Sequence, residues 1–198
     1  MRTQTINIYS FDELSEEAKE KALNDYREGM TEIFGIDETV ESLKGLFKNC
    51  NGITLKNWSL GDCQSWLNVT FENDEIGDFT GKRAMSWIEN NLLVNIRIPE
   101  NSFAMNGTRR KLAQYGQYYR AGMIKCCPFT GYCADDDFLQ DLISEVKQGT
   151  DLKTAFEGLA VTCQKLIQNE QEYQQSEEYI KEHFEMNNCE FDEDGNLI

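Results

Sequence analysis

The sequence contains a single histidine, His183, among its 198 residues. Histidine is the side chain that titrates near neutral pH, so one copy leaves few options for acid–base or Cys–His nucleophilic chemistry. His183 lies between Glu182 and Glu185, where a surface position is expected. The phosphate-binding signatures G-x-x-x-x-G-K-[ST] and G-x-G-x-x-G are also absent. These absences predict a protein without catalytic residues, and therefore not an enzyme.

Long apolar runs are missing too. No stretch approaches the roughly 20 apolar residues that a membrane span needs. The first nine residues alternate polar and apolar side chains and do not form the apolar block of a signal peptide. We therefore expect no membrane partner and a cytoplasmic location. With 40% apolar residues, the chain has enough material for a buried core.

Seven cysteines, an odd number, are scattered along the chain, which favours reduced thiols over a disulfide scaffold. Three of them, Cys126, Cys127 and Cys133, are concentrated in one segment. Structural zinc sites usually take ligands in C-x2-4-C pairs, often with a histidine, and adjacent cysteines are not expected to reach one ion. The sequence thus predicts no metal and no cofactor, with the thiols acting as small buried residues.

Three consecutive aspartates, Asp135, Asp136 and Asp137, follow this segment. Consecutive residues point in different directions from a helix, so the three carboxylates are not expected to converge on one ion. Carboxylates are favoured in the first turn of a helix by the helix dipole. We expect these aspartates to mark a helix start.

The net charge of −16 is unevenly distributed. Residues 1–81 contain 7 basic residues (Lys and Arg) and 16 acidic residues (Asp and Glu). Residues 82–134 contain 8 basic and 2 acidic residues, and residues 135–198 contain 4 basic and 17 acidic residues. A basic middle segment therefore lies between two acidic arms. Such a charge disfavours nucleic acid over most of the surface and attracts basic partners.

The pattern of apolar residues predicts one α+β domain over residues 1–198, with a small antiparallel sheet packed with helices, a helical C-terminal half and a short C-terminal hairpin. Alternation predicts strands at 3–9, 53–60 and 65–72, and extended chain at 92–98. Ser10–Glu13 has the spacing of a capping box. Helices are expected after the N-caps Ser15, Asp37 and Ser176, and over 82–91, 108–119, 135–147 and 152–173.

The basic middle segment offers an alternative function. Its cations are interleaved with aromatic residues, the mixture that contacts phosphates and stacks bases. A nucleotide or nucleic-acid site would use Arg109, Arg110, Lys111 and Tyr115.

Three stretches, Tyr9–Ala22, Cys127–Cys133 with Asp135, and Cys189–Ile198, together resemble a group of small acidic proteins encoded by phages and prophages of gut and low-GC Gram-positive bacteria. The resemblance implies an accessory protein of a mobile element. Acidic proteins of that origin include anti-CRISPR and other anti-defence inhibitors. The resemblance transfers no catalytic residue.

Charge and resemblance together predict a stoichiometric inhibitor of a host defence protein or nuclease complex, acting through acidic surfaces as a DNA mimic. The residues expected to contact the partner lie on the first helix and near the C-terminus: Glu16, Glu17, Glu20, Asp25, Glu177, Glu178 and Glu182. Binding of nucleic acid stays open as the alternative.

Overall fold

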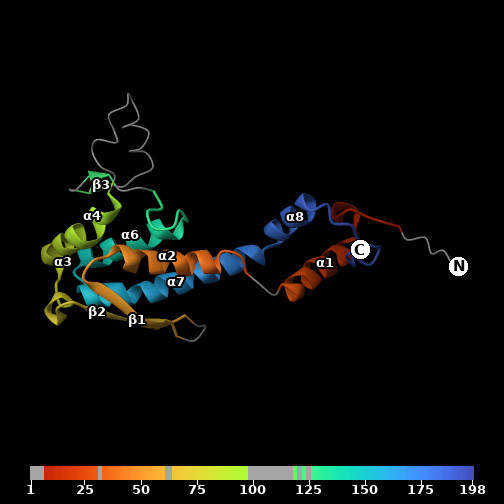
Figure 1. Ribbon diagram of the computed structural model, residues 1–198. Coiled ribbons are helices and arrows are strands. Elements are labelled where there is room, and N and C mark those ends of the chain that lie inside the picture. The colour runs from red at the N-terminus through yellow and green to blue at the C-terminus, as the bar shows by residue number, and fades with distance from the viewer. Residues whose placement is uncertain (1–6, 31–32, 61–63, 98–117, 120–121, 124–125) are drawn as a thin grey trace, which may run out of the picture. The chain divides into compact units, whose positions relative to one another are not determined.

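A computed structural model describes residues 7–30, 33–60, 64–97, 118–119, 122–123 and 126–198, and Figure 1 draws the other residues in grey. The predicted α+β class is confirmed, including the helical C-terminal half. The chain divides into two compact units. Residues 1–34 and 168–198 form the terminal unit, and residues 35–167 form the central unit.

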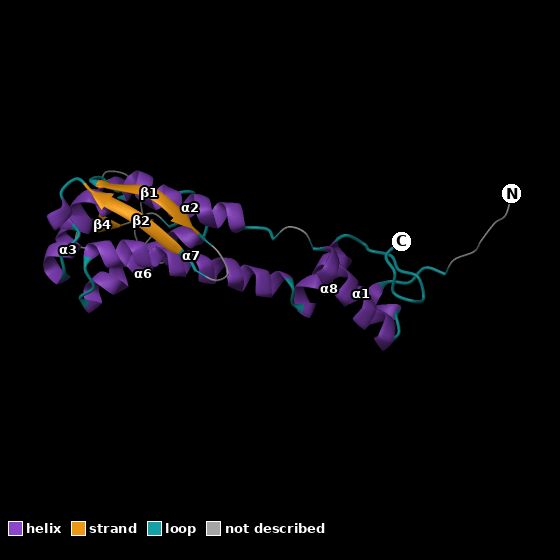
Figure 2. Ribbon diagram, turned by 90° about the horizontal axis from the view of Figure 1, so that it is seen from below, coloured by secondary structure: helices purple, strands orange, loops and turns teal. Residues whose placement is uncertain are grey.

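The central unit combines helices with a two-stranded sheet. Its helices are α2 (Ile36–Asn49), α3 (Gly81–Ile88), α4 (Val94–Ile96), α6 (Ala134–Gln148) and the first part of α7 (Leu152–Gln174). Its strands are β1 (Ile53–Ser59), β2 (Trp66–Phe71) and the short pair β3 (Tyr118–Tyr119) and β4 (Gly122–Met123). The β1–β2 sheet lies along one side of the layer that α2, α6 and α7 form (Figures 1 and 2).

The antiparallel pairing of β1 with β2 confirms the strands predicted at 53–60 and 65–72, with Ile53 opposite Phe71 and Ser59 opposite Trp66. In β2, buried and exposed residues alternate strictly. This is the pattern of a sheet with one face on the core. The apolar face of β2 therefore fixes the register, because a slip of one residue would expose it.

Phe156 on α7 is the centre of the core of the central unit. Its fully buried ring contacts those of Phe47 on α2, Phe71 on β2 and Trp87 on α3, with centroids 5.8–6.1 Å apart. Tilted and edge-on aromatic pairs at such distances are favourable beyond the area that they bury. One side chain thus ties together the sheet and three helices.

Two predicted boundaries in this unit are wrong. Residues 92–96 are helical rather than extended: α3 continues through a π-helical turn (Glu89–Leu93) into α4. The reason is packing, since Leu92, Leu93 and Ile96 are buried together. The N-cap of α2 is Gly35, with φ +86°, and Asp37 lies in the first turn.

The helix expected over 108–119 lies largely outside the described residues. The two described residues of that range, Tyr118 and Tyr119, are in strand β3, paired with β4.

The terminal unit is built from both ends of the chain. It contains a 3-10 turn (Phe11–Glu13), α1 (Glu16–Gly29), the end of α7 and α8 (Glu177–Met186), with α1 and α8 in contact (Figure 1). Tyr9 and Phe191 join the ends by an antiparallel bridge with backbone hydrogen bonds of 2.8 and 2.9 Å. Of the strand expected over 3–9, residues 3–6 lie outside the described part.

The caps of these helices follow the prediction. The Glu13 carboxylate accepts hydrogen bonds from the Ser10 amide at 2.9 Å and hydroxyl at 2.8 Å. These two donors, the backbone N–H first, lower the pKa of Glu13. Ser15 Oγ accepts from Ala18 N, and Ser176 Oγ from Tyr179 N.

The predicted C-terminal hairpin turns at Asp194-Gly195 and brings Leu197 back to pair with Phe191. The Gly195 N–H donates to the Asp192 carbonyl, and Gly195 has φ +81°. Its backbone lies directly against α1, where a Cβ would be 3.2 Å from Ala18 Cα and closer still to the Ala18 carbonyl oxygen.

Among the described residues, no helix has both the length and the apolar character that a membrane crossing requires. The prediction of a single domain stays a prediction, because two compact units can still unfold as one cooperative block.

We expect Gly195→Ala to destabilise the terminal unit by at least about 1–2 kcal/mol, because alanine is strained at positive φ and its Cβ meets the α1 backbone. The measurement is urea unfolding followed by far-UV circular dichroism. Gly29→Ala is the matched control, since a Cβ at the end of α1 meets nothing within 4 Å. Equal stability of the two variants would contradict this account of Gly195.

The same experiment tests the single-domain prediction. All three tryptophans, Trp58, Trp66 and Trp87, belong to the central unit, so their fluorescence reports on that unit alone. A single domain requires Gly195→Ala to shift the fluorescence and circular dichroism transitions together. A shift in circular dichroism alone would show that the units unfold separately.

Candidate functional site

Most of the negative charge belongs to the terminal unit. It contains 5 basic residues (Lys and Arg) and 18 acidic residues (Asp and Glu), a net charge of −13. The central unit contains 14 basic and 17 acidic residues, a net charge of −3. The N-terminal end of one acidic arm and the C-terminal end of the other thus form a single compact unit. An acidic surface is the most distinctive property of this unit.

A groove of about 530 Å³ runs over this surface, between the 3-10 turn, α1 and α8. Acidic, basic and apolar side chains line it: Phe11, Asp12, Glu16, Glu17, Lys19, Glu20, Leu23, Asn24, Arg27, Glu177 and Lys181. Five of these residues are acidic and three are basic. The groove is therefore suited to a polar, cationic partner rather than to an apolar ligand.

The lysines of the groove pair locally and leave other carboxylates free. Lys19 contacts Glu16 at 3.1 Å, and Lys181 contacts Glu177 at 2.6 Å. The hydrogen bond and charge of Lys181 lower the pKa of Glu177. Within the part of the chain that the structure describes, exposed Glu17 and Glu20 form no salt bridge. Their full charge is available to a partner.

The structure brings together four of the seven residues that the sequence proposed for partner binding, because Glu16, Glu17, Glu20 and Glu177 all line the groove. Glu178 and Glu182 are exposed on α8 and do not line it. Asp25 faces a different cavity and pairs with Lys21 at 3.2 Å.

Sequence reasoning missed Asp12 and Arg27 as groove residues. Arg27 lies in the last turn of α1, and its Nε donates to the Gln175 carbonyl at 3.0 Å. No local signal in the sequence predicts this contact between the two ends of the chain.

The second cavity, of about 470 Å³, also lies within the terminal unit, and its lining is mostly apolar: Ala22, Asp25, Tyr26, Gly29, Met30, Phe34, His183, Phe184, Phe191 and Leu197. His183 is half-buried here, with its ring centroid 5.0 Å from that of Tyr26. His183 is thus at the surface only in part, because aromatic rings pack against the imidazole.

The cysteine segment of the central unit is a loop fixed at both sides. Gly45 on α2 lies so close to it that a Cβ would be 2.8 Å from Phe129 Cβ, and the hydroxyls of Ser42 and Thr130 are 2.9 Å apart. On the other side, the fully buried Asp135 accepts hydrogen bonds from three backbone amides, those of residues 129, 130 and 131, at 2.7–3.1 Å. The Thr130 hydroxyl adds a fourth at 3.0 Å.

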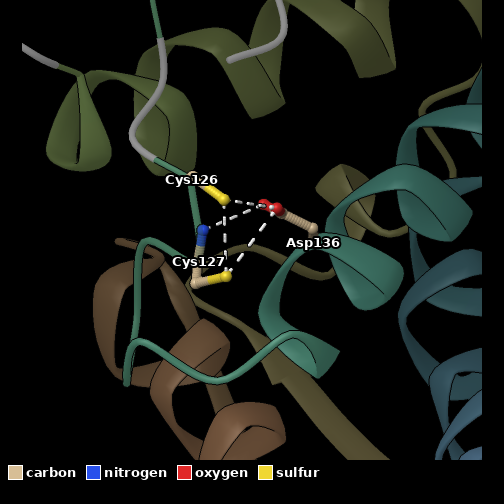
Figure 3. Close-up of side chains that lie close together, drawn as sticks. All are labelled: Cys126, Cys127 and Asp136. Carbon is tan, nitrogen blue, oxygen red and sulfur yellow. Dashed lines mark hydrogen bonds between the residues drawn. The ribbon is translucent and has the colours of Figure 1, made fainter. Parts of the chain in front are cut away.

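Asp136, the next residue, faces the thiols instead (Figure 3). Its Oδ1 accepts from the Cys127 amide at 3.2 Å, and its Oδ2 lies 3.3 Å from Cys126 Sγ and 3.9 Å from Cys127 Sγ. The two sulfur atoms are 3.5 Å apart. The three aspartates diverge as predicted, but two expectations about the cysteines are wrong. Adjacent cysteines do converge in this loop, and Cys126 and Cys133 are exposed rather than buried.

The environment of the two thiols raises both pKa values. For Cys127 the main cause is burial, followed by the hydrogen bond with Cys126 and the charge of Asp136. For Cys126 the hydrogen bond with Cys127 lowers the pKa, but the hydrogen bond to Asp136, burial and neighbouring charges outweigh it. Neither thiol is thus activated as a nucleophile by these neighbours, since nucleophilic cysteines need a lowered pKa.

Arg109, Arg110, Lys111 and Tyr115, the residues of the alternative nucleotide or nucleic-acid site, lie outside the described residues. That alternative stays a prediction.

No protein-family model matches the chain, and searches of curated proteins and of solved structures found no match either.

Asp135→Asn should lower the free energy of unfolding by at least about 2 kcal/mol, because hydrogen bonds to a buried charge contribute about 1.5–3 kcal/mol each. Asp137→Asn is the matched control, because this neighbouring aspartate is exposed. Urea unfolding followed by tryptophan fluorescence measures both variants. Similar stabilities would contradict the anchoring role of Asp135.

Proposed function

We propose that this protein is a stoichiometric binding protein whose terminal unit occupies a basic surface of its partner. The observation that carries the proposal is the concentration of charge, with a net −13 of the total −16 in residues 1–34 and 168–198. Exposed carboxylates held on packed helices attract the Lys and Arg side chains that otherwise contact nucleic-acid phosphates. The protein would thus act as a DNA mimic.

The partner class that we propose is a defence nuclease of a bacterial host, with CRISPR nucleases as the first to test. The resemblance of Tyr9–Ala22 and Cys189–Ile198 to phage and prophage proteins supports this choice. Both stretches belong to the acidic terminal unit. CRISPR nucleases hold nucleic acid in positively charged channels, which an acidic surface complements.

A binding role also agrees with the chemistry of the described residues. His183 is packed among aromatic rings, and the environment of Cys126 and Cys127 raises their pKa values. These groups do not form the nucleophile–base pair that covalent catalysis requires. We therefore propose that inhibition proceeds by occupancy, without turnover.

Reversing three groove charges, by Glu16→Lys, Glu17→Lys and Glu20→Lys in one variant, should weaken binding to the partner about 10- to 100-fold. Exposed ion pairs contribute about 0.2–1 kcal/mol each, and a tenfold change in affinity corresponds to about 1.4 kcal/mol. The measurement is retention by, and then affinity for, each member of a panel of guide-loaded nucleases.

The matched control reverses Asp37, Glu38 and Glu41 on α2. These exposed residues repeat the spacing of 16, 17 and 20 near a helix start, and Glu41 pairs with Lys44 three residues later as Glu16 pairs with Lys19. The change in charge is identical in the two variants. Loss of affinity in both would indicate nonspecific attraction, and no loss in the groove variant would remove this mechanism.

Titration of nuclease activity separates occupancy from catalysis. Inhibition by occupancy should be complete near one equivalent of protein and should weaken as salt rises, because screening acts over about 8 Å at 0.15 M ionic strength. Complete inhibition by a small fraction of an equivalent would contradict a stoichiometric mechanism and favour an enzyme.

A further inference from the structure

Cys126, Cys127 and Asp136 place three metal-binding atoms close together. The two sulfurs and a carboxylate oxygen all lie within 4.8 Å of one another. Figure 3 shows the three side chains pointing toward one another, two from the loop and one from α6. Among the described residues, this is the one group of three such ligands.

The spacing of these atoms fits a tetrahedral zinc ion. With Zn–S of about 2.3 Å and Zn–O of about 2.1 Å, tetrahedral geometry separates two sulfurs by about 3.8 Å and a sulfur from an oxygen by about 3.6 Å. The observed separations are 3.5 Å between the sulfurs, and 3.3 and 3.9 Å from the sulfurs to Asp136 Oδ2. Each agrees with the ideal value within about 0.3 Å.

The backbone explains how two adjacent cysteines reach one point. Cys127 has φ +46°, which is uncommon for a residue other than glycine. The other oxygen of Asp136 accepts from the Cys127 amide at 3.2 Å, which orients the carboxylate. Such hydrogen bonds around a metal ligand fix its direction before the ion arrives.

The rest of the loop is held independently of these three residues. The four hydrogen bonds to buried Asp135 and the contact of Phe129 with Gly45 fix the segment that follows Cys127. The ligands are therefore positioned by the fold, which lowers the ordering cost of binding an ion.

We propose that Cys126 Sγ, Cys127 Sγ and Asp136 Oδ2 bind one Zn²⁺ ion. Thiolate ligands select zinc over the hard cations Mg²⁺ and Ca²⁺. Because Cys126 is exposed, water can supply the fourth ligand. Cys133, the third thiol of the segment, lies outside this group of mutually close ligand atoms.

The test uses the full chain, purified with a reductant, freed of metal by a chelator and then titrated with Zn²⁺ alone. We expect one zinc per chain by elemental analysis. Co²⁺ in place of Zn²⁺ should give sulfur-to-cobalt charge-transfer absorption. Cys127→Ser and Asp136→Asn should each weaken zinc binding by at least about 10- to 100-fold. Loss of a hydrogen bond that only orients a metal ligand already has an effect of this size.

Cys189→Ser is the matched control, because this half-buried thiol belongs to the terminal unit and should leave zinc binding unchanged. Tryptophan fluorescence verifies that each variant keeps a folded central unit. The proposal is overturned if the reduced protein binds no zinc, or if Cys127→Ser and Cys189→Ser bind it equally. Formation of a Cys126–Cys127 disulfide on air oxidation, in a protein that binds no zinc when reduced, would also overturn it.

Discussion

The terminal unit depends on an aromatic cluster that holds two acidic helices together. Phe11, Phe184 and Phe191 are buried, with ring centroids 5.1–6.1 Å apart, and Tyr26 of α1 packs edge-on against Phe184 of α8 at 5.4 Å. Burying one such side chain contributes about 1.5–3 kcal/mol, whereas two exposed like charges about 8 Å apart repel by roughly 0.5 kcal/mol in water before screening. Burial of these rings therefore offsets several such pairwise repulsions in a unit whose net charge is −13.

This balance also determines what the surface can do. The described salt bridges on α1 and α8 join lysines to carboxylates three or four residues away on the same helix. Exposed pairs of this kind are weak, so a partner with a denser array of cations can displace them. Apolar packing beneath α1 and α8, rather than these ion pairs, therefore holds the groove in shape.

Local patterns predicted much of the fold, and long-range contacts account for what they missed. Ser15, Ser176 and the alternation in β2 act within a few residues, so sequence reasoning placed them correctly. The pairing of Tyr9 with Phe191 joins positions at opposite ends of the chain and has no local signature. Four of the residues proposed for partner binding line the groove, but their gathering with Arg27 and Lys181 was not predicted. The convergence of adjacent thiols depends on the positive φ of Cys127, which residue type does not indicate.

Asp135 and Asp136 show why residue type alone does not define a site. The buried Asp135 accepts hydrogen bonds from three amides of the preceding loop at Oδ2 and from one hydroxyl at Oδ1. These four hydrogen bonds attach Asp135 to the loop. Asp136 accepts from one amide, and its other contacts are thiols, whose protons leave when a metal binds. Neighbouring aspartates therefore take different roles: one shapes the loop, and the other keeps an oxygen available for the ion that the loop is shaped to receive.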